Sequence, residues 1–307
     1  RLRNDWLLLA GKRRDWASFA AEHPRFRMRD DAQLRCYAVA MDLSQGRPVG
    51  AAAAEQVRAD WLGQRDLDDA CLLAADLLHQ AGRLADQDIW RKARLGMETN
   101  RPAMARAAVA LLAPDVAAEV AQIQNSPGRY LASRLGAVTR KRQELASLAL
   151  IKLATSDPDQ AAALMDGKWA SQLQPEERHW TWAVIGKQAA LKLQDNATRH
   201  FAQIVSDTDL TDELLAWKAR AGLRAGQWHM VRGAIEAMSA EARAQPDWTY
   251  WLARARLARA SGEPERAQAR QLLESVAGTR GFYEKLAQEE LGRPLAVPPA
   301  PPALSAE

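Results

Sequence analysis

The sequence has little of several features that would point to a particular class of protein. Its 307 residues include two Cys, four Phe and four Tyr, and β-branched residues are few. No apolar run approaches 18 residues, so we expect no transmembrane segment. The chain begins at Arg1, with neither an initiator Met nor a signal peptide, which favours a mature or trimmed product.

Motifs for catalysis and cofactor binding are also missing. The chain has no phosphate-cradling loop, no dinucleotide fingerprint and no G-x-S-x-G. None of its five His stands at metal-ligand spacing from another His or a Cys; they are His23, His79, His179, His200 and His229. We therefore expect no cofactor, no metal site and no catalytic residue in this chain.

The charges are mixed rather than segregated. The formal net charge is +4 and the pI is about 9.2, and the signs alternate along most of the chain. The stretch closest to a run of like charge is TRKRQE at 139–144. A solvated helical surface explains this pattern better than a phosphate-binding stripe, so no nucleic-acid partner is predicted.

What the chain does contain is helix-forming and apolar. Hydrophobic residues make up 48% of it, and Ala and Leu dominate them. Ala and Leu lose little freedom on entering a helix, whereas β-branched side chains lose more. The composition therefore predicts an almost purely helical chain, in which the eleven Trp would fill spaces between stacked helices.

Breaks recur along the chain at a nearly constant spacing. They fall at Gly11, Gly46, Gly82, Gly226 and Gly262, and Gly46 and Gly82 are 36 residues apart, as are Gly226 and Gly262. Such a period is typical of helix–turn–helix repeats of the tetratricopeptide kind, with each Gly in the left-handed conformation that ends a helix. Between Gly82 and Gly226 the predicted breaks lie at Pro114, 156–158 and 195–196 instead, so the repeats are degenerate.

The predicted fold is therefore an all-α solenoid, a superhelix of degenerate tetratricopeptide-like hairpins over residues 1–292. Within the unit WTYWLARARLARASGEPERAQARQLL, we expect Ala253 and Ala258 to allow close helix packing and Leu257 to fill an apolar layer. An alternative for the same stretch is a ligand cage built around Trp248, Tyr250 and Trp251.

The two Cys lie one repeat apart. Cys36 and Cys71 are separated by 35 residues and fall on corresponding helices of neighbouring hairpins. Corresponding positions on packed helices are about 8–10 Å apart, whereas a disulfide requires Cα atoms within about 7 Å. Spacing alone leaves both alternatives open, a disulfide or two buried thiols.

The order of segments along the chain resembles the N-terminal superhelical domain of the soluble lytic murein transglycosylases. The final segment, RGFYEKLAQEELGRP at 280–294, is the most specific part of this resemblance. Four other stretches support it by their order, namely LRNDWLLLAGKRRDWASF (2–19), LRCYAVAMDLSQG (34–46), DACLLAADLL (69–78) and DWTYWLARARLARASGEPERA (247–267). The resemblance covers nearly the whole chain.

The resemblance implies a function that the residues alone do not show. It implies a periplasmic protein whose superhelix holds and orients a lysozyme-like catalytic domain on peptidoglycan glycan strands. The same hypothesis includes contact between a basic inner face of the superhelix and the glycan strand. The segments around Cys36 and Cys71 match those that carry the family's Cys pair, so the resemblance favours the disulfide, as does an oxidising compartment.

The catalytic domain itself is expected to be absent. The family's general acid is a Glu followed by Ser, and the one such pair here is Glu274-Ser275, which no Met-Gln segment follows. We do not carry the catalytic role onto Glu274. The Pro-rich stretch 293–307 is predicted to be an extended linker or tail, and whether this chain is an enzyme remains open at this point.

Two functions of other classes compete with this hypothesis. The first is a tetratricopeptide-like adaptor that binds a peptide or protein partner in its groove. The second is a repeat protein that binds RNA with one base per repeat, which would need recurring polar pairs and a larger positive charge. A gel shift with single-stranded RNA at varied salt would test the second.

Overall fold

The computed structural model describes residues 2–28 and 30–294, and these residues form an all-α protein. They contain nineteen α-helices and three short segments of other helix types, and no strand occurs among them. The predicted fold class, a solenoid of helix hairpins, is confirmed. No helix in this part of the chain combines the length and the hydropathy needed to cross a bilayer.

The chain folds as two compact units, each of which is a series of packed helices. Unit 1 comprises Arg1–Asp157 and Leu164–Leu173, and unit 2 comprises Pro158–Ala163 and the chain from Gln174 onward. The single domain predicted for 1–292 remains a proposal. Most of the Pro-rich tail predicted for 293–307 lies outside the described residues, which end at residue 294.

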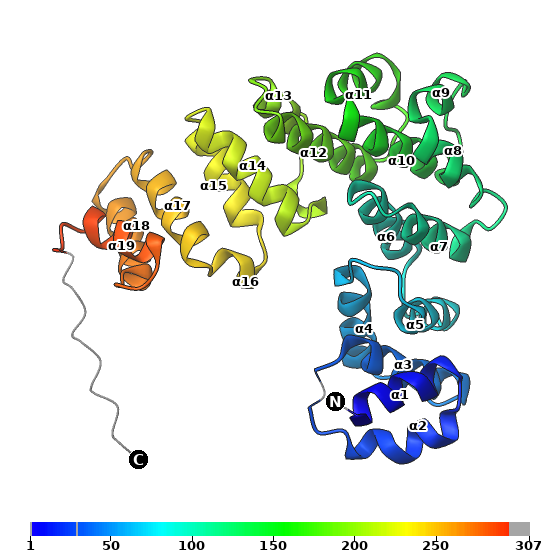
Figure 1. Cartoon of the computed structure of the whole chain (residues 1–307). Coiled ribbons are helices and arrows are strands. Elements are labelled where there is room, and N and C mark those ends of the chain that lie inside the picture. The colour runs from blue at the N-terminus through cyan, green and yellow to red at the C-terminus, as the bar shows by residue number, and fades with distance from the viewer. Residues whose placement is uncertain (1, 29, 295–307) are drawn as a thin grey trace, which may run out of the picture. The chain divides into compact units, whose positions relative to one another are not determined.

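Unit 1 contains the first ten helices, in the order shown from blue to green in Figure 1. They are α1 (Leu2–Lys12), α2 (Trp16–Glu22), α3 (Ala32–Ser44), α4 (Ala51–Gly63), α5 (Asp69–Gln80), α6 (Asp86–Glu98), α7 (Pro102–Leu112), α8 (Glu119–Asn125), α9 (Pro127–Ala132) and α10 (Arg140–Ser156), with the 3-10 helix η1 (His23–Arg25) and the π-helix η2 (Met165–Trp169). Consecutive helices such as α6 and α7 pack against each other as hairpins.

Unit 2 repeats the same hairpin arrangement. Its helices are α11 (Pro158–Leu164, the last residue being assigned to unit 1), α12 (Pro175–Leu191), α13 (Ala197–Phe201), α14 (Asp212–Arg224), α15 (Trp228–Ala237), α16 (Ala240–Arg243), α17 (Pro246–Leu257), α18 (Glu263–Val276) and α19 (Phe282–Glu290), with the 3-10 helix η3 (Asp207–Asp209). The predicted breaks at Pro114 and 195–196 fall between helices, and the one at 156–158 covers the end of α10 and the start of α11.

One type of helix end recurs along both units. A residue with positive φ follows the helix, and the next N–H donates to the carbonyl five residues before it, at 2.7–3.0 Å. This is the Schellman motif, which satisfies carbonyls left free at a helix C-terminus. It occurs at Arg14, Gly46, Gly82, Asn100, Leu193, Gly226 and Gly292. The glycine prediction is thus confirmed at Gly46, Gly82 and Gly226.

The same prediction is wrong at Gly11 and Gly262. Gly11 lies inside α1 and is buried against Tyr37, whose ring atom Cδ2 would be 2.4 Å from an added Cβ. The left-handed residue of that hairpin is Arg14 instead. Gly262 has an extended backbone with φ −158° and stands at the N-cap of α18. At these two positions glycine is used for close packing and for a helix start.

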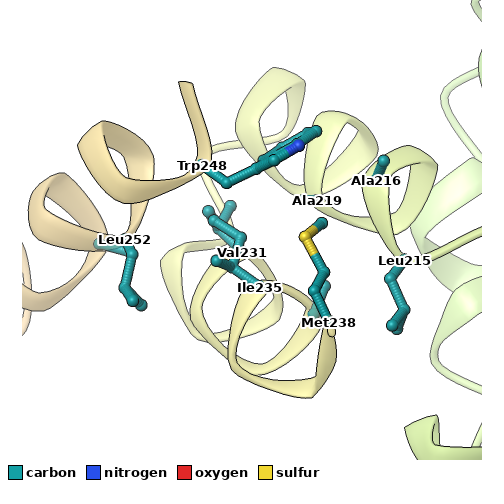
Figure 2. Packing of buried hydrophobic residues seen from close by; sticks show 10 residues of the cluster. Leu215, Ala216, Ala219, Val231, Ile235, Met238, Trp248 and Leu252 are labelled. Carbon is teal, nitrogen blue, oxygen red and sulfur yellow. The ribbon is translucent and has the colours of Figure 1, made fainter. Parts of the chain in front are cut away.

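The core of unit 2 is built from small residues in the helices and large ones between them. Ala219 of α14 and Ala234 of α15 are fully buried, which lets these helices approach closely. The Trp248 side chain of α17, 8% exposed, extends over α14 and α15 (Figure 2). Trp248 therefore fills the space between neighbouring hairpins, as predicted for the tryptophans.

The register predicted for the stretch at 248–273 needs correction. Ala253 is buried, but Ala258 is exposed at the end of α17. Leu257 is half-buried and packs on the edge of a cluster formed by Tyr250, Ala253, Leu273 and Ala287. The apolar layer is thus filled by residues earlier in the helix, because α17 ends at Leu257 and the next residue, Ala258, is exposed.

Candidate functional site

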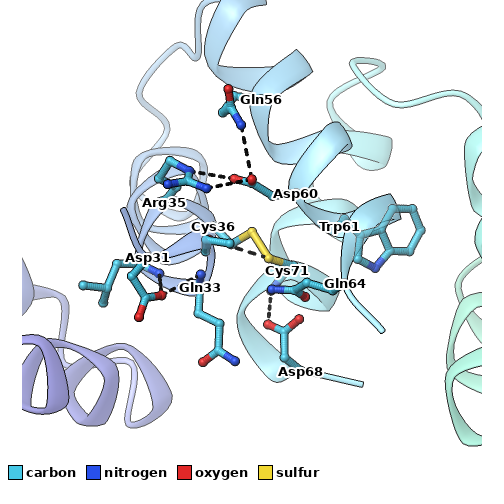
Figure 3. Close-up of a disulfide and its surroundings, with 12 residues drawn as sticks. Asp31, Gln33, Arg35, Cys36, Gln56, Asp60, Trp61, Gln64, Asp68 and Cys71 are labelled. Atoms are coloured by element: carbon cyan, nitrogen blue, oxygen red, sulfur yellow. Dashed lines mark hydrogen bonds and ion pairs between the residues drawn. A yellow bond between two sulfur atoms is a disulfide. The ribbon is translucent and has the colours of Figure 1, made fainter. Parts of the chain in front are cut away.

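The Cys36–Cys71 disulfide links α3 to α5 at the centre of the first repeats. Both sulfur atoms are bonded and both residues are fully buried (Figure 3). Their Cα atoms are 4.9 Å apart, well inside the roughly 8–10 Å expected from helix packing. Ala40 and Ala74, one turn further along their helices, are also fully buried, and such small residues allow this approach. The disulfide that the resemblance favoured is present.

The face of α3 next to the disulfide lines a groove. A cavity of about 440 Å³ lies between α3, α4 and the segment around η1. Its apolar walls come from both helices and from the η1 segment, and comprise Pro24, Phe26, Leu34, Ala38, Val39, Ala53 and Val57. Its polar lining consists of His23, Asp31, Arg35, Asp42 and Gln56. Apolar side chains thus make up most of its wall.

The polar groups of the groove are held in place by contacts outside it. The Arg35 guanidinium makes two hydrogen bonds to the Asp60 carboxylate, at 2.7 and 2.8 Å, and this contact raises the pKa of Arg35 (Figure 3). Asp31 caps α3 by accepting from the N–H groups of Gln33 and Leu34. The arrangement can bind an apolar group beside fixed hydrogen-bonding partners, and it offers no pairing of nucleophile and base.

Lys92 holds the C-terminal end of α4 in place. Its side chain is 2% exposed, and its Nζ donates to the carbonyl oxygens of Trp61 and Gln64, the latter at 2.7 Å. These carbonyls stand at the C-terminus of α4, where backbone acceptors lack helical partners. Burial lowers the pKa of Lys92 to about 8, against the opposing charge of Asp68.

This burial predicts a pH dependence of stability. In the unfolded chain Lys92 has a pKa of about 10.4, above its folded value, so the unfolded state binds more protons between pH 8 and 10. The free-energy cost of burying the Lys92 charge therefore applies in full below pH 8. It decreases as the pH rises, because the folded chain can then bury the amine without its proton. The free energy of unfolding should increase from pH 7 to 10 by about 2 kcal/mol relative to Lys92→Met.

Urea unfolding of both chains across this range measures the difference. Tyr37 and Tyr130, whose pKa values burial raises to about 12, affect both chains alike. A difference that stays constant with pH would show that Lys92 is charged throughout.

The residues singled out as possible catalytic or metal groups are dispersed. His79 contacts Asp86 and His179 contacts Asp209, each as a separate pair. No group of three or more potential metal ligands occurs among the described residues. Glu274 lies on the surface of α18 with its side chain 53% exposed and paired with Arg293, and Ser275 donates to the Leu272 carbonyl.

Sequence reasoning did not find the groove residues. Asp31 could have been found as a helix N-cap, because an Asp directly before an apolar-periodic stretch is a usual start signal. Arg35 and Asp60 are 25 residues apart, and no pattern in the sequence connects them. In the sequence, Lys92 is one of many charged residues of alternating sign, and only the structure shows that it is buried.

The comparisons with known proteins agree with the resemblance. No protein-family model matches the chain. The soluble lytic murein transglycosylases of Escherichia coli and Salmonella typhimurium are 20% and 21% identical to it over 294 residues, which is 92% of this chain. The chain spans 43% of the length of these relatives. The resemblance drawn from the sequence is thus confirmed.

A solved structure shows the same fold. The lytic transglycosylase Slt from Pseudomonas aeruginosa, solved as an inactive mutant, superimposes with a TM-score of 0.57 at 23% identity. The match covers 96% of this chain and 47% of that one. At this identity the likeness establishes the helical architecture.

Proposed function

We propose that this chain is the non-catalytic, superhelical scaffold of a periplasmic lytic transglycosylase that cleaves peptidoglycan. The observation that carries the proposal is the similarity to soluble lytic murein transglycosylases along 92% of the chain. Because the chain spans less than half of those relatives, its own part would be to position a catalytic domain on the glycan strand.

Two features of the structure support this role. Within each unit, consecutive hairpins pack against each other, and such packed hairpins suit a protein that holds another domain. The buried Cys36–Cys71 disulfide is of the kind that persists in oxidising compartments, and this supports the periplasm as the location.

The first test is activity. Incubated with purified sacculi, the chain should release no soluble 1,6-anhydromuropeptides above a heat-killed control, as measured by chromatography. The general acid of such a reaction needs an environment protected from solvent, whereas the Glu274 side chain is 53% exposed. Release above the control would contradict the assignment as a scaffold.

The alternative is an adaptor that binds a peptide, and the apolar groove between α3 and α4 is the observation that favours it. Ala53→Trp fills this groove from an exposed position, and Ala52→Trp, also exposed on α4, is a matched control outside it. Pelleting of the chain with sacculi supports the scaffold. Peptide capture that Ala53→Trp alone abolishes would favour the adaptor.

A further inference from the structure

The segment 133–139, between α9 and α10, presents two aliphatic side chains to solvent. Leu135 is 102% exposed and Val138 is 94% exposed, the two highest values among the exposed large hydrophobic residues of the described chain. Ala137, between them, is 5% exposed and faces inward. The segment therefore buries the small Ala137 side chain and exposes the larger Leu135 and Val138 side chains.

Hydrogen bonds to the backbone hold the segment in this orientation. Lys168 Nζ donates to the Arg134 carbonyl at 2.5 Å, and the Ala137 N–H donates to Gln172 Oε1 at 2.7 Å. A Cβ on Gly136 would lie 3.1 Å from the same Gln172 oxygen. The two bonds hold the backbone at Arg134 and at Ala137, on either side of Leu135 and directly before Val138.

Basic residues flank the two aliphatic residues along the chain, and one more, Lys168, hydrogen-bonds to the segment. Six basic residues lie in or beside the segment, namely Arg129, Arg134, Arg140, Lys141, Arg142 and Lys168. Three carboxylates accompany them, the exposed Asp115 and Asp166 and the partly buried Glu119, while the fully buried Glu144 is shared between Arg94 and Arg140. The six basic residues thus outnumber the carboxylates, and three of them, Arg140, Lys141 and Arg142, belong to the TRKRQE stretch, for which the sequence suggested only a solvated role.

A cavity lined by residues that carry polar groups adjoins the start of the segment. It measures about 370 Å³ and is lined by Gln122, Asn125, Ser126, Arg129, Tyr130 and Ser133. The Arg129 side chain forms no ion pair with any of the described residues, unlike Arg134 and Arg142, which both contact Glu119. A guanidinium among hydroxyl and amide groups suits a phosphate oxygen.

From these observations we infer that the segment 133–139 is a membrane-docking tip that inserts Leu135 and Val138 shallowly into a bilayer containing anionic phospholipid. Exposed aliphatic side chains in a stretch rich in basic residues are the composition that binds the interface of such a bilayer. A stable protein interface buries about 800 Å² on each partner, which two side chains on a short tip do not supply. The area and the charge therefore favour a lipid surface over a protein partner.

Co-sedimentation with vesicles tests this inference. We expect the chain to pellet with vesicles of phosphatidylcholine and phosphatidylglycerol at low salt, and to remain in solution with phosphatidylcholine alone or at high salt. Leu135→Ser combined with Val138→Ser should lower the partition coefficient by about tenfold or more, since both side chains would insert. Arg129→Glu should also lower it, by removing a phosphate partner and adding repulsion.

Matched variants control for surface changes elsewhere. Val205→Ser changes an aliphatic residue that is 88% exposed in unit 2, and Arg259→Glu makes the same charge change on an exposed arginine of that unit. Both should bind the anionic vesicles as the unaltered chain does. The inference fails if the chain ignores anionic vesicles, if the Leu135 and Val138 changes leave binding intact, or if the controls reduce binding equally. Circular dichroism establishes that each variant is folded.

Discussion

Replacing Arg94 by methionine should lower the free energy of unfolding by about 3–5 kcal/mol, because it leaves a buried carboxylate without its buried partner. Arg94 of α6 and Glu144 of α10 are both 0% exposed, and Arg94 Nη1 lies 2.6 Å from Glu144 Oε2. The pair joins two helices that are 50 residues apart in sequence. Urea unfolding followed by circular dichroism measures the loss.

The chain offers a matched control on the same carboxylate. Arg140 contacts the other oxygen of Glu144 at 2.8 Å, but its own side chain is 42% exposed. Water can replace much of what Arg140 contributes, so Arg140→Met should cost less than about 1 kcal/mol. Combining Arg94→Met with Glu144→Leu should restore much of the loss, since no buried charge then remains. A loss below about 1 kcal/mol for Arg94→Met alone would mean that water reaches Glu144.

The repeat architecture was predictable because it depends on short stretches of sequence that mark where helices end. Gly46, Gly82 and Gly226 mark helix ends, and Gly is the residue that adopts the left-handed conformation most readily. Arg14, Asn100 and Leu193 adopt the same conformation without being Gly, so those ends carry no such signal. The packing of neighbouring hairpins outweighs a backbone cost of about 1–2 kcal/mol at each of them.

The candidate site was less predictable, because it depends on contacts between distant segments. The groove forms where the η1 segment meets the face of α3 and α4, and nothing in the sequence fixes that meeting. Gly11 and Gly262 show the same limit at the level of single residues. Their roles in close packing and in starting a helix become visible only when their neighbours are known.

The disulfide was partly predictable from the sequence. Its removal should cause the second large loss of stability. The sequence spacing of Cys36 and Cys71 was compatible with a disulfide or with two thiols. In the structure α3 and α5 approach closely and the disulfide is formed. Because the bond closes a loop of 35 residues, chain entropy assigns it about 3–4 kcal/mol. For a unit of this size, that corresponds to a fall in Tm of roughly 10 °C.

Reductant should therefore lower the Tm of the unaltered chain, and Cys36→Ser should reproduce most of the loss without reductant. The double variant Cys36→Ala with Cys71→Ala should melt at the lower temperature and show no further response to reductant. The loss should appear first as faster amide exchange in α3 and α5, since the disulfide joins these two helices directly. Alkylation without reductant, followed by mass spectrometry, reports the bond directly. Two alkylated thiols in protein recovered from an oxidising compartment would refute the disulfide, and with it one of the supports for a periplasmic location.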